Sequence, residues 1–498
     1  MFSALTSSLL LFPSITAFLL ILRRIVQSLR PSESHHGVPR PPVIPDWVPF
    51  LGSALSMTRG DSFWRDTAAQ YGPVFRARVM GETRIFVTTT PVINYVYKNS
   101  SNFDFFFFRK FITATVFGMS MDNSFHPAVD AQLFPGHHRA MQPGAIAGTI
   151  TRYADLLELM LPARLEALGP DEEVDLADFA FDLIYTASSK AFFSSSFPSA
   201  ATKAPFVAFD QAFPLLNLGK LPSFAKKPAE KARETMLSLV EEWWDSVTSE
   251  ERETLAPALM AMVEVAEAEA WPKRDVAALL LGDLWALEAN APNGAIWAIA
   301  EILRHPHILP SLRSEIDTAI SRLDPPHLST LLHLPQSQLV LILAELNACF
   351  QETLRLYTDS FSLRVVQKDC VLPPGLCAGG IGAERGLALK HDDQVVCVSR
   401  PNAVSPESEW GVDAPKWDHT RFLDGRAKGV MNPFGGGVSM CEGRHFASAE
   451  ILTFIASFIT LADVTVTNDT LTPDAQRIGL GMLQPKGTFK VRIASRSI

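Results

Sequence analysis

The chain has 498 residues, of which 47% are hydrophobic, and a formal net charge of −9 at pH 7. This composition is sufficient for a sizeable core, and length alone suggests two or three domains. The acidic charge, with no basic run and no zinc-ligand spacing, argues against a nucleic-acid partner. The five cysteines are odd in number, lie in the last third and include no Cys-x-x-Cys pair, so we expect a reducing compartment and no disulfide framework.

The first 22 residues carry no charge and are followed by Arg23 and Arg24. About 20 apolar residues can span a bilayer as a helix. Basic residues after the run place the following domain on the cytoplasmic side, whereas a cleaved signal peptide carries them before its apolar core. We predict that residues 1–24 form a retained membrane anchor; a signal peptide and a buried helix are the alternatives.

A proline-rich segment follows, with prolines at positions 39, 41, 42, 45 and 49. Closely spaced prolines fix φ and remove backbone donors, so the segment should be stiff and extended. We predict a hinge over residues 25–52 and a main domain over residues 53–498. An ordinary linker at a domain boundary is the alternative interpretation.

Two apolar stretches in the body of the chain carry unusual residues. Phenylalanines gather at 103–108 and 117, near Met119, and such clusters more often form core than pocket. Residues 284–297 are typical of a long apolar helix interrupted by Pro292 and Gly294. Amides both donate and accept hydrogen bonds. Asn290 and Asn293 therefore either hold a water or satisfy backbone groups that the interruption frees.

A helix is predicted over residues 339–356, and it contains Glu352 and Arg355. Residues three apart share a helix face, so these two can form an ion pair, although most such pairs lie on solvated faces. Alternating residues after the helix predict a short strand over 360–366 that carries Arg364.

Cys441 lies in the run Phe434-Gly-Gly-Gly-Val-Ser-Met-Cys441-Glu-Gly443-Arg. Three glycines allow the backbone to approach a flat ligand. The helix predicted over residues 445–461 points its N-terminus back at the sulfur, which stabilises a thiolate. This geometry suits a cysteine that ligates haem iron; a glycine-rich turn around a buried cysteine is the alternative.

The same run resembles the haem loop of the cytochrome P450 family, Phe-x-x-Gly-x-Arg/His-x-Cys-x-Gly. It matches at Phe434, Gly437, Cys441 and Gly443, and departs at Ser439, where most members carry a basic residue that pairs with a haem propionate. The resemblance covers nearly the whole chain. It implies a mainly α fold with small β-sheets and an N-terminal transmembrane helix. It also implies haem b with Cys441 as axial thiolate ligand, in a cofactor loop that includes Phe434, Gly435 and Gly443.

The resemblance assigns roles to other charged residues. Residues 417–422 resemble the family's Pro-Glu-Arg-Phe segment, which makes Arg421 the third member of a buried structural network with Glu352 and Arg355. An arginine at the place of Arg364 reaches a haem propionate in relatives. The usual Trp-x-x-x-Arg pair is not recognisable, and residues 137–139 (His-His-Arg) are weak substitutes for it.

The interrupted helix departs from the family's usual Ala/Gly-Gly-x-Asp/Glu-Thr, whose acid and alcohol relay protons. Pro292 replaces the acid and Asn293 the threonine, after Ala289 and Asn290. This pattern resembles a branch that contains bile-acid sterol hydroxylases and prostacyclin synthase. One arm hydroxylates with O2 and supplied electrons, and the other rearranges a peroxide without a reductase. Asn290 and Asn293 are therefore the candidate catalytic residues.

We expect a monooxygenase that oxidises a hydrophobic molecule, such as a sterol, terpenoid or related secondary metabolite. A haem-thiolate isomerase or dehydratase is the alternative, and a non-catalytic haem sensor or lipid-binding protein would not need the Glu-Arg-Arg set. The expected partners are NADPH–cytochrome P450 reductase, with or without cytochrome b5, and the endoplasmic reticulum membrane. The protein would be single-pass with a cytoplasmic catalytic domain, and residues 215–224 would dip into the membrane. The expected apolar pocket is lined by Phe117, Met119, Ala289, Ser360, Phe361, Leu480 and Met482.

Overall fold

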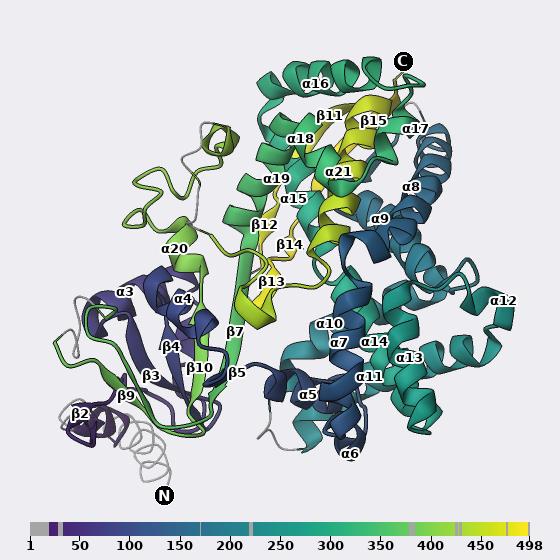
Figure 1. The fold of residues 1–498 in the computed structure, drawn as a ribbon. Helices are drawn as coiled ribbons and strands as arrows, with labels where there is room; N and C mark the ends of the chain where they lie inside the picture. The colour runs from purple at the N-terminus through teal and green to yellow at the C-terminus, as the bar shows by residue number, and fades with distance from the viewer. Residues whose placement is uncertain are drawn as a thin grey trace, which may run out of the picture. The chain divides into compact units, whose positions relative to one another are not determined.

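A computed structural model gives the fold drawn in Figure 1. The structure describes residues 19–27, 33–169, 171–218, 223–377, 384–423, 427, 431–474 and 477–496. Their fold is mainly helical with small β-sheets, which confirms the predicted fold class. The chain forms two compact units. Unit 1 comprises Met1–Phe108, Phe361–Gly411 and Gly436–Ser439, and unit 2 comprises Arg109–Ser360, Val412–Gly435 and Met440–Ile498.

The predicted anchor falls mainly on residues 1–18, which lie outside the described residues. Residues 19–27 are helical. Within the described ranges, no helix is both long and apolar enough to cross a membrane. The N-terminal transmembrane helix and the boundaries after residues 24 and 52 therefore stay predictions.

Unit 1 is built on a sheet in which β7, β10, β4 and β3 lie side by side in that order, with β5 paired to the end of β7 (Figure 1). β10 runs parallel to β4, and the other pairs are antiparallel. The elements of this unit, including β7 and α5 that continue into unit 2, are β1 (Ser34–His35), β2 (Val38–Pro39), α2 (Ala54–Met57), α3 (Asp61–Tyr71), β3 (Val74–Val79), β4 (Glu82–Val87), α4 (Thr90–Lys98), β5 (Phe103–Asp104), α5 (Phe106–Thr115), β7 (Thr358–Val366), β8 (Cys370–Leu372), β9 (Leu387–Leu389), β10 (Gln394–Val398), α20 (Arg400–Val404) and η4 (Gly437–Ser439).

Both faces of this sheet are buried. Successive side chains of a strand point to opposite faces, and β4 follows this rule, with Ile85 and Val87 in one hydrophobic cluster and Phe86 in another. β10 divides in the same way, with Val395 and Cys397 on one side and Val396 and Val398 on the other. These strands are thus continuous apolar runs, as buried strands are expected to be.

The proline-rich segment joins the edge of the same sheet. The backbone N–H of Arg76 donates to Pro42 O at 2.7 Å, and that of Ile44 donates to Arg76 O at 2.9 Å. The Arg76 side chain also donates to Pro41 O at 2.8 Å. Proline lacks a donor, so it is tolerated at a sheet edge. Residues 41–44 of the predicted hinge are therefore held against β3.

Unit 2 is largely helical, and its sheets are small (Figure 1). Within the described residues its elements are α6 (Met121–Ser124), η1 (Val129–Leu133), α7 (Phe134–Ala140), α8 (Pro143–Glu166), β6 (Glu173–Asp175), α9 (Leu176–Phe193), α10 (Ser199–Asn217), α11 (Ser223–Ser246), α12 (Ser249–Arg252), α13 (Pro257–Ala268), α14 (Lys273–Glu288), α15 (Ala291–Arg304), η2 (Pro306–Ile308), α16 (Leu309–Ser321), α17 (Leu328–Leu332), α18 (Gln336–Ile342), α19 (Ala344–Tyr357), η3 (His419–Phe422), α21 (Arg444–Leu461), β11 (Ala462–Asp469), β12 (Thr472–Pro473), β13 (Leu480–Met482), β14 (Pro485–Lys486) and β15 (Phe489–Ser495).

The core of unit 2 is formed by α15 and α21, with α8, α9 and α19 packed around them. α15 is buried from Ala291 to Ile302 and α21 from residue 448 to residue 460. Helices that are apolar on all sides belong in the interior of a domain. The single helix predicted over residues 339–356 is instead two helices, α18 and α19, because Leu343 leaves the helical conformation with φ −103° and ψ 58°.

Candidate active site

The loop that ends at Cys441 folds back on itself in unit 2. The Cys441 backbone N–H donates to Phe434 O at 2.8 Å. The backbone N–H groups of Gly443 and Arg444, at the start of α21, act to lower the pKa of the Cys441 thiol. The side chain is accessible, yet desolvation by surrounding atoms raises the pKa of its thiol, and these two N–H groups offset that rise only in part. The sulfur is thus placed at a helix start, as the sequence predicts, and an adjacent cation would complete the stabilisation of its thiolate.

Two of the loop glycines are required because Tyr97 of the same chain lies against them. In unit 1, a Cβ atom on Gly436 would lie 2.4 Å from the Tyr97 ring, and one on Gly437 would lie 2.5 Å from Tyr97 O. Gly437 also has φ +59°, where a side chain is strained. In unit 2, a Cβ on Gly443 would meet only ordinary contacts, 3.6 Å from Met141 Cε and 3.9 Å from the Cys441 sulfur. The loop backbone at Gly436 and Gly437 therefore lies close to α4. The sequence did not reveal this reason for the two glycines.

Arg364 is buried in unit 1, and no carboxylate of the described residues lies within ion-pair distance of it, although Asp104 is close enough to act on its pKa. Its side chain is 1% exposed and donates to the hydroxyls of Ser439 and Ser362 and to Leu363 O. Its guanidinium also lies over the rings of Tyr97 and Phe105, at 5.3 and 4.9 Å from their centroids. It makes no ion pair with the described residues within 4 Å, and burial lowers the pKa of the guanidinium. A buried charge of this kind is costly unless an anion accompanies it.

Glu352, Arg355 and Arg421 come together inside unit 2. Arg355 donates from Nε and Nη2 to the two Glu352 carboxylate oxygens, both at 2.6 Å, and neither side chain is exposed. Arg421 Nε lies 3.4 Å from Glu352 Oε1. Arg355 also donates to the backbone oxygens of Ala414 and Lys416. The trio therefore clamps the end of α19 to the segment that precedes the Cys441 loop.

A second charged cluster surrounds Glu442, the residue after the cysteine, and sequence reasoning missed it. His137 of α7 lies 2.6 Å from Glu442 Oε2 and 3.1 Å from Asp283 Oδ2 on α14. Arg109 donates to both Glu442 oxygens, at 3.0 and 3.1 Å. These partners lower the pKa of Glu442 to about 2, and the two carboxylates raise the pKa of His137 to about 9. The sequence signal was the His-His-Arg string at 137–139, of which His137 is the buried member.

The interrupted helix is two helices, α14 and α15, separated at residues 289 and 290. Asn290 caps α15 with φ −126° and ψ −45°, and Pro292 stands in the first turn, where its missing N–H costs nothing. Asn293 is buried, and its Nδ2 donates to Ala289 O at 3.0 Å. Asn293 therefore satisfies one backbone oxygen that the break frees.

Asn290 binds the hairpin strand β13. Its Oδ1 accepts from the Met482 backbone N–H at 2.9 Å and from Arg477 Nη1 at 3.4 Å. A Cβ on Gly481 would lie 2.3 Å from the same Asn290 oxygen, and Gly481 has φ +115°. Only glycine fits this approach. A Cβ on Gly294 would also lie 3.8 Å from Met482 Cε, which places Met482 beside the start of α15.

Asp210 of α10 extends this polar contact to a third element. The buried Asp210 carboxylate accepts from Arg477 Nη2 at 2.9 Å, from Trp285 Nε1 at 2.8 Å and from the Gln484 side chain. Arg477 itself is 4% exposed and also donates to Met482 O at 2.8 Å. The cluster joins α10, α14 and the β13 hairpin, although its members lie up to 274 residues apart in the chain.

The remaining predicted pocket residues have different surroundings. Phe117 packs against Phe209, Phe213 and Trp285 in unit 2. Ser360 pairs with Leu480 across β7 and β13. Met119 and Ala289 are buried. Phe361, on the opposite face of β7 from Ser360, packs in the core of unit 1 against Trp64 and Phe86, so we assign it to the core.

Two carboxyl groups, one of them at the end of α14, are buried in unit 2. Glu288 ends α14 and Glu450 lies on α21, and both are about 1% exposed. Ser188 donates to Glu450 Oε1, whereas both Glu288 oxygens and Glu450 Oε2 have no hydrogen-bond partner among the described residues. Burial raises the pKa of Glu450 to about 8, and burial together with repulsion from Glu450 raises the pKa of Glu288 well above its ordinary value. Glu450 is therefore mainly protonated at neutral pH.

The family is decided by comparison with known sequences. The sequence model of the family described as Cytochrome P450 matches residues 41–492. This chain belongs to the cytochrome P450 family. It is therefore a haem-thiolate monooxygenase, an oxidoreductase, and its cofactor is haem b with Cys441 as axial ligand. When bound, haem b supplies the chemistry of O2 activation.

Relatives with curated names are similar over almost their full length. Mouse cytochrome P450 7B1 is 25% identical, with 97% of this chain and 94% of the relative covered. Bovine prostacyclin synthase is 24% identical over 92% and 94%. Mouse 24-hydroxycholesterol 7-alpha-hydroxylase is 25% identical over 92% and 93%. These relatives include both arms of the branch that the sequence resembles, which confirms the resemblance.

The residues present fit haem b. In unit 2, the accessible Cys441 sulfur lies at the start of α21, where two backbone N–H groups favour the thiolate that a haem ligand needs. In unit 1, Arg364 is a buried cation without a carboxylate partner among the described residues, and a propionate has the charge that it lacks. Ser439 binds Arg364, so the loop position that lacks the usual basic residue is in contact with one from β7.

Proposed function

We propose that this cytochrome P450 hydroxylates or otherwise oxidises a hydrophobic molecule of sterol or terpenoid size, or a related secondary metabolite. The oxidation uses O2 and electrons from NADPH–cytochrome P450 reductase. The observation that carries the proposal is the full-length similarity to 24-hydroxycholesterol 7-alpha-hydroxylase. Phe117, Met119, Ala289, Leu480 and Met482 support it, because an apolar lining with few polar groups suits such a ligand.

We assign the proton route to Asn293, with Asn290 in a positioning role. The Asn290 oxygen is engaged by Met482 and Arg477. Asn293 uses Nδ2 for Ala289 O, and no hydrogen bond to its Oδ1 occurs among the described residues. The Asn293 oxygen is thus available to orient a water molecule at the break, where most relatives carry an acid and an alcohol.

The test uses the haem-loaded protein with reductase, NADPH and 24-hydroxycholesterol as the first probe of a sterol panel. Oxidised product should form in proportion to the NADPH consumed. Asn293→Ala should lower product per NADPH and raise peroxide release with little change in substrate binding, because positioned acid–base groups are worth about 10²–10⁴-fold. Asn293→Thr, which restores the usual alcohol, should keep the coupling. If Asn293→Ala leaves the product formed per NADPH unchanged, the only role of Asn293 is to donate a hydrogen bond to Ala289 O.

The similarity to prostacyclin synthase favours a second candidate, rearrangement of a peroxide or epoxide without external electrons. Loss of the acid–alcohol pair agrees with this reaction, in which no O2-derived water is formed. An organic endoperoxide supplied without NADPH and reductase separates the two functions. Turnover under those conditions, with none from the sterol panel, would replace monooxygenation by rearrangement.

We also propose attachment to the endoplasmic reticulum membrane through residues 1–24, with the catalytic domain in the cytoplasm and cytochrome b5 as a second electron donor. Exposed apolar side chains near the α10–α11 connection support a second membrane contact. Leu215 is 40% exposed and Phe224 is 75% exposed. Large apolar side chains beside Lys226 and Lys227 are typical of segments that lie at a lipid interface.

A further inference from the structure

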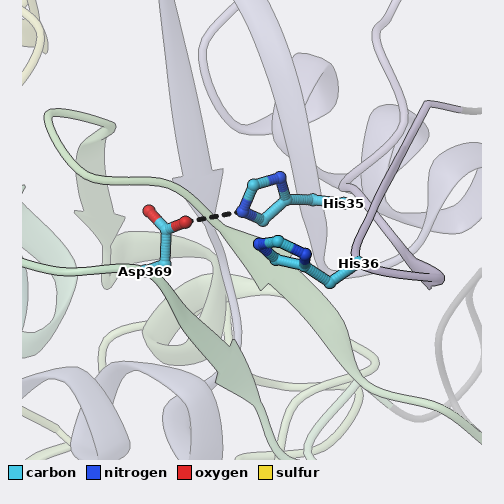
Figure 2. A group of neighbouring side chains, drawn as sticks. All are labelled: His35, His36 and Asp369. Atoms are coloured by element: carbon cyan, nitrogen blue, oxygen red, sulfur yellow. Dashed lines mark hydrogen bonds and ion pairs between the residues drawn. The ribbon is translucent and has the colours of Figure 1, made fainter.

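Three side chains with metal-ligand chemistry meet on the surface of unit 1. His35 ends β1, His36 begins the following turn, and Asp369 immediately precedes β8. One ligand atom from each lies within 4.8 Å of the other two. Figure 2 shows both imidazoles turned toward the Asp369 carboxylate, with His35 Nε2 at 2.6 Å from Asp369 Oδ2. Residues up to 334 positions apart thus bring nitrogen and oxygen atoms that can bind a metal ion into one compact group.

The backbone explains why two adjacent histidines face the same partner. In a continuous strand, successive side chains point to opposite faces. Here the β1–β2 hairpin turns at His36 and Gly37, which have φ +49° and +78°. Positive φ at both central residues is typical of the two-residue hairpin turn. The turn rotates His36 beside His35, with ring centroids 4.1 Å apart.

The Asp369 carboxylate is held in place by a hydrogen bond from the backbone of His391. The His391 backbone N–H donates to Asp369 Oδ1 at 2.8 Å, which leaves Oδ2 directed at the histidines. The His391 hydrogen bond is the main cause that lowers the pKa of Asp369, and the hydrogen bond with His35 adds to this lowering. The His35 and Asp369 side chains are 23% and 46% exposed, and an ion from solution can therefore reach them.

We propose that His35, His36 and Asp369 form a binding site for a divalent transition-metal ion of the Zn²⁺ class. Two imidazole nitrogens and one carboxylate oxygen suit zinc, with about 2.0–2.2 Å to each ligand and a water in the remaining position. Mg²⁺ and Ca²⁺ prefer all-oxygen sites. The bound ion replaces the direct His35–Asp369 hydrogen bond.

Such an ion would join two separate parts of unit 1. It connects the β1–β2 hairpin, which precedes the extended segment at Pro41–Ile44, to the strand pair β8–β9. The site holds no haem-loop residue and does not depend on the proposed function. Its role is to fix the start of the folded domain by a metal cross-link.

The test measures Zn²⁺ binding to the full-length, haem-loaded protein by competition with a chromogenic chelator at pH 7.5. We expect one tight site per chain. His36→Asn keeps a residue that tolerates positive φ in the turn but removes the imidazole. It should weaken binding at least about tenfold, as should Asp369→Asn, since even outer-shell changes cost 10–100-fold.

His391→Ala is the matched control, because it removes a neighbouring imidazole and keeps the backbone N–H bound to Asp369. It should bind Zn²⁺ as the parent does. Lower pH should release the ion as the histidines become protonated. Absence of a stoichiometric site in the parent, or undiminished binding in His36→Asn, would overturn the proposal. Equal loss in His391→Ala would also overturn it, by assigning the ion to another set of ligands.

Discussion

At position 439 a serine stands where most cytochromes P450 have a basic residue, and its hydroxyl accepts from Arg364. The sequence predicted that Arg364 should compensate for this serine, because it is the next cation with a matching place in the family pattern. It did not predict that the two would touch. That contact depends on the burial of Arg364 against Tyr97 and Phe105, which come from α4 and the β5–α5 connection.

Glu450 permits a pH-dependent prediction. Its pKa is raised to about 8 in the folded protein by burial, against an ordinary value near 4.5 in the unfolded chain. The folded state therefore binds more protons between these values, and this contribution to stability is full below pH 4.5 and declines as pH rises to 8. The slope from one such group is about 1.4 kcal/mol per pH unit. Glu450→Gln should flatten the decline, as measured by denaturant unfolding at pH 6 and pH 8.5.

Exposed Glu253 provides the comparison, because Glu253→Gln should leave the slope as it is in the parent. Ser188 can donate to the glutamine oxygen as it does to Glu450 Oε1, so the variant keeps that hydrogen bond. If Glu450→Gln and the parent lose stability in parallel between pH 6 and pH 8.5, the carboxyl group is ionised in the folded protein.

Among the elements, the break between α14 and α15 was predictable from the sequence, and the residues that bind beside it were not. Pro292 and Gly294 indicated an interruption, and α15 does begin just before Pro292. The alternative that the asparagines satisfy freed backbone groups also came from the sequence, and Asn293 does bind Ala289 O. The hydrogen bonds of Asn290 to Met482 and of Asp210 to Arg477 join residues 192 and 267 positions apart. No local pattern indicates such pairs, because tertiary packing alone brings them together.

The clamp between α19 and the segment before the haem loop gives a prediction at this scale. Glu352→Ala would leave Arg355, which has no exposed surface, without its carboxylate. Removing one partner of a buried ion pair costs about 3–5 kcal/mol. We expect little folded haem protein, measured as soluble yield and haem content after expression.

Lys416→Ala is the control for the Glu352 variant. Lys416 forms an exposed pair with Asp413 at 2.7 Å in the same segment, and its backbone oxygen still accepts from Arg355 after the substitution. Exposed pairs contribute little to stability, so the yield and haem content of this variant should match those of the parent. Normal haem content in Glu352→Ala would show that the clamp is dispensable.

For the whole molecule, the fold class and the family were accessible from the sequence, because one motif around Cys441 and the order of the other motifs are specific. Which residues form each of the two compact units was not accessible, since unit 1 gathers residues from three separated stretches. The proposed anchor is the N-terminal part of unit 1, and Leu215 and Phe224 of unit 2 add exposed apolar surface.

Deletion of residues 1–30 tests this membrane arrangement. The truncated protein should leave the membrane fraction in large part and keep its haem, because the haem ligand and the described core lie beyond the deletion. Some attachment should persist through residues 215–224, and Leu215→Ser with Phe224→Ser in the truncated protein should remove it. Sedimentation of membranes in high salt measures the bound share. Full retention of the truncated protein would assign the main attachment to another surface.

The contact between Asn290 and Gly481 constrains how this branch can change. The asparagine oxygen occupies the space in which a side chain at position 481 would begin, and it also receives the N–H of Met482. Mutation at either position alone therefore encounters a clash or leaves a donor unpaired. Across homologues, positions 290 and 481 should consequently covary.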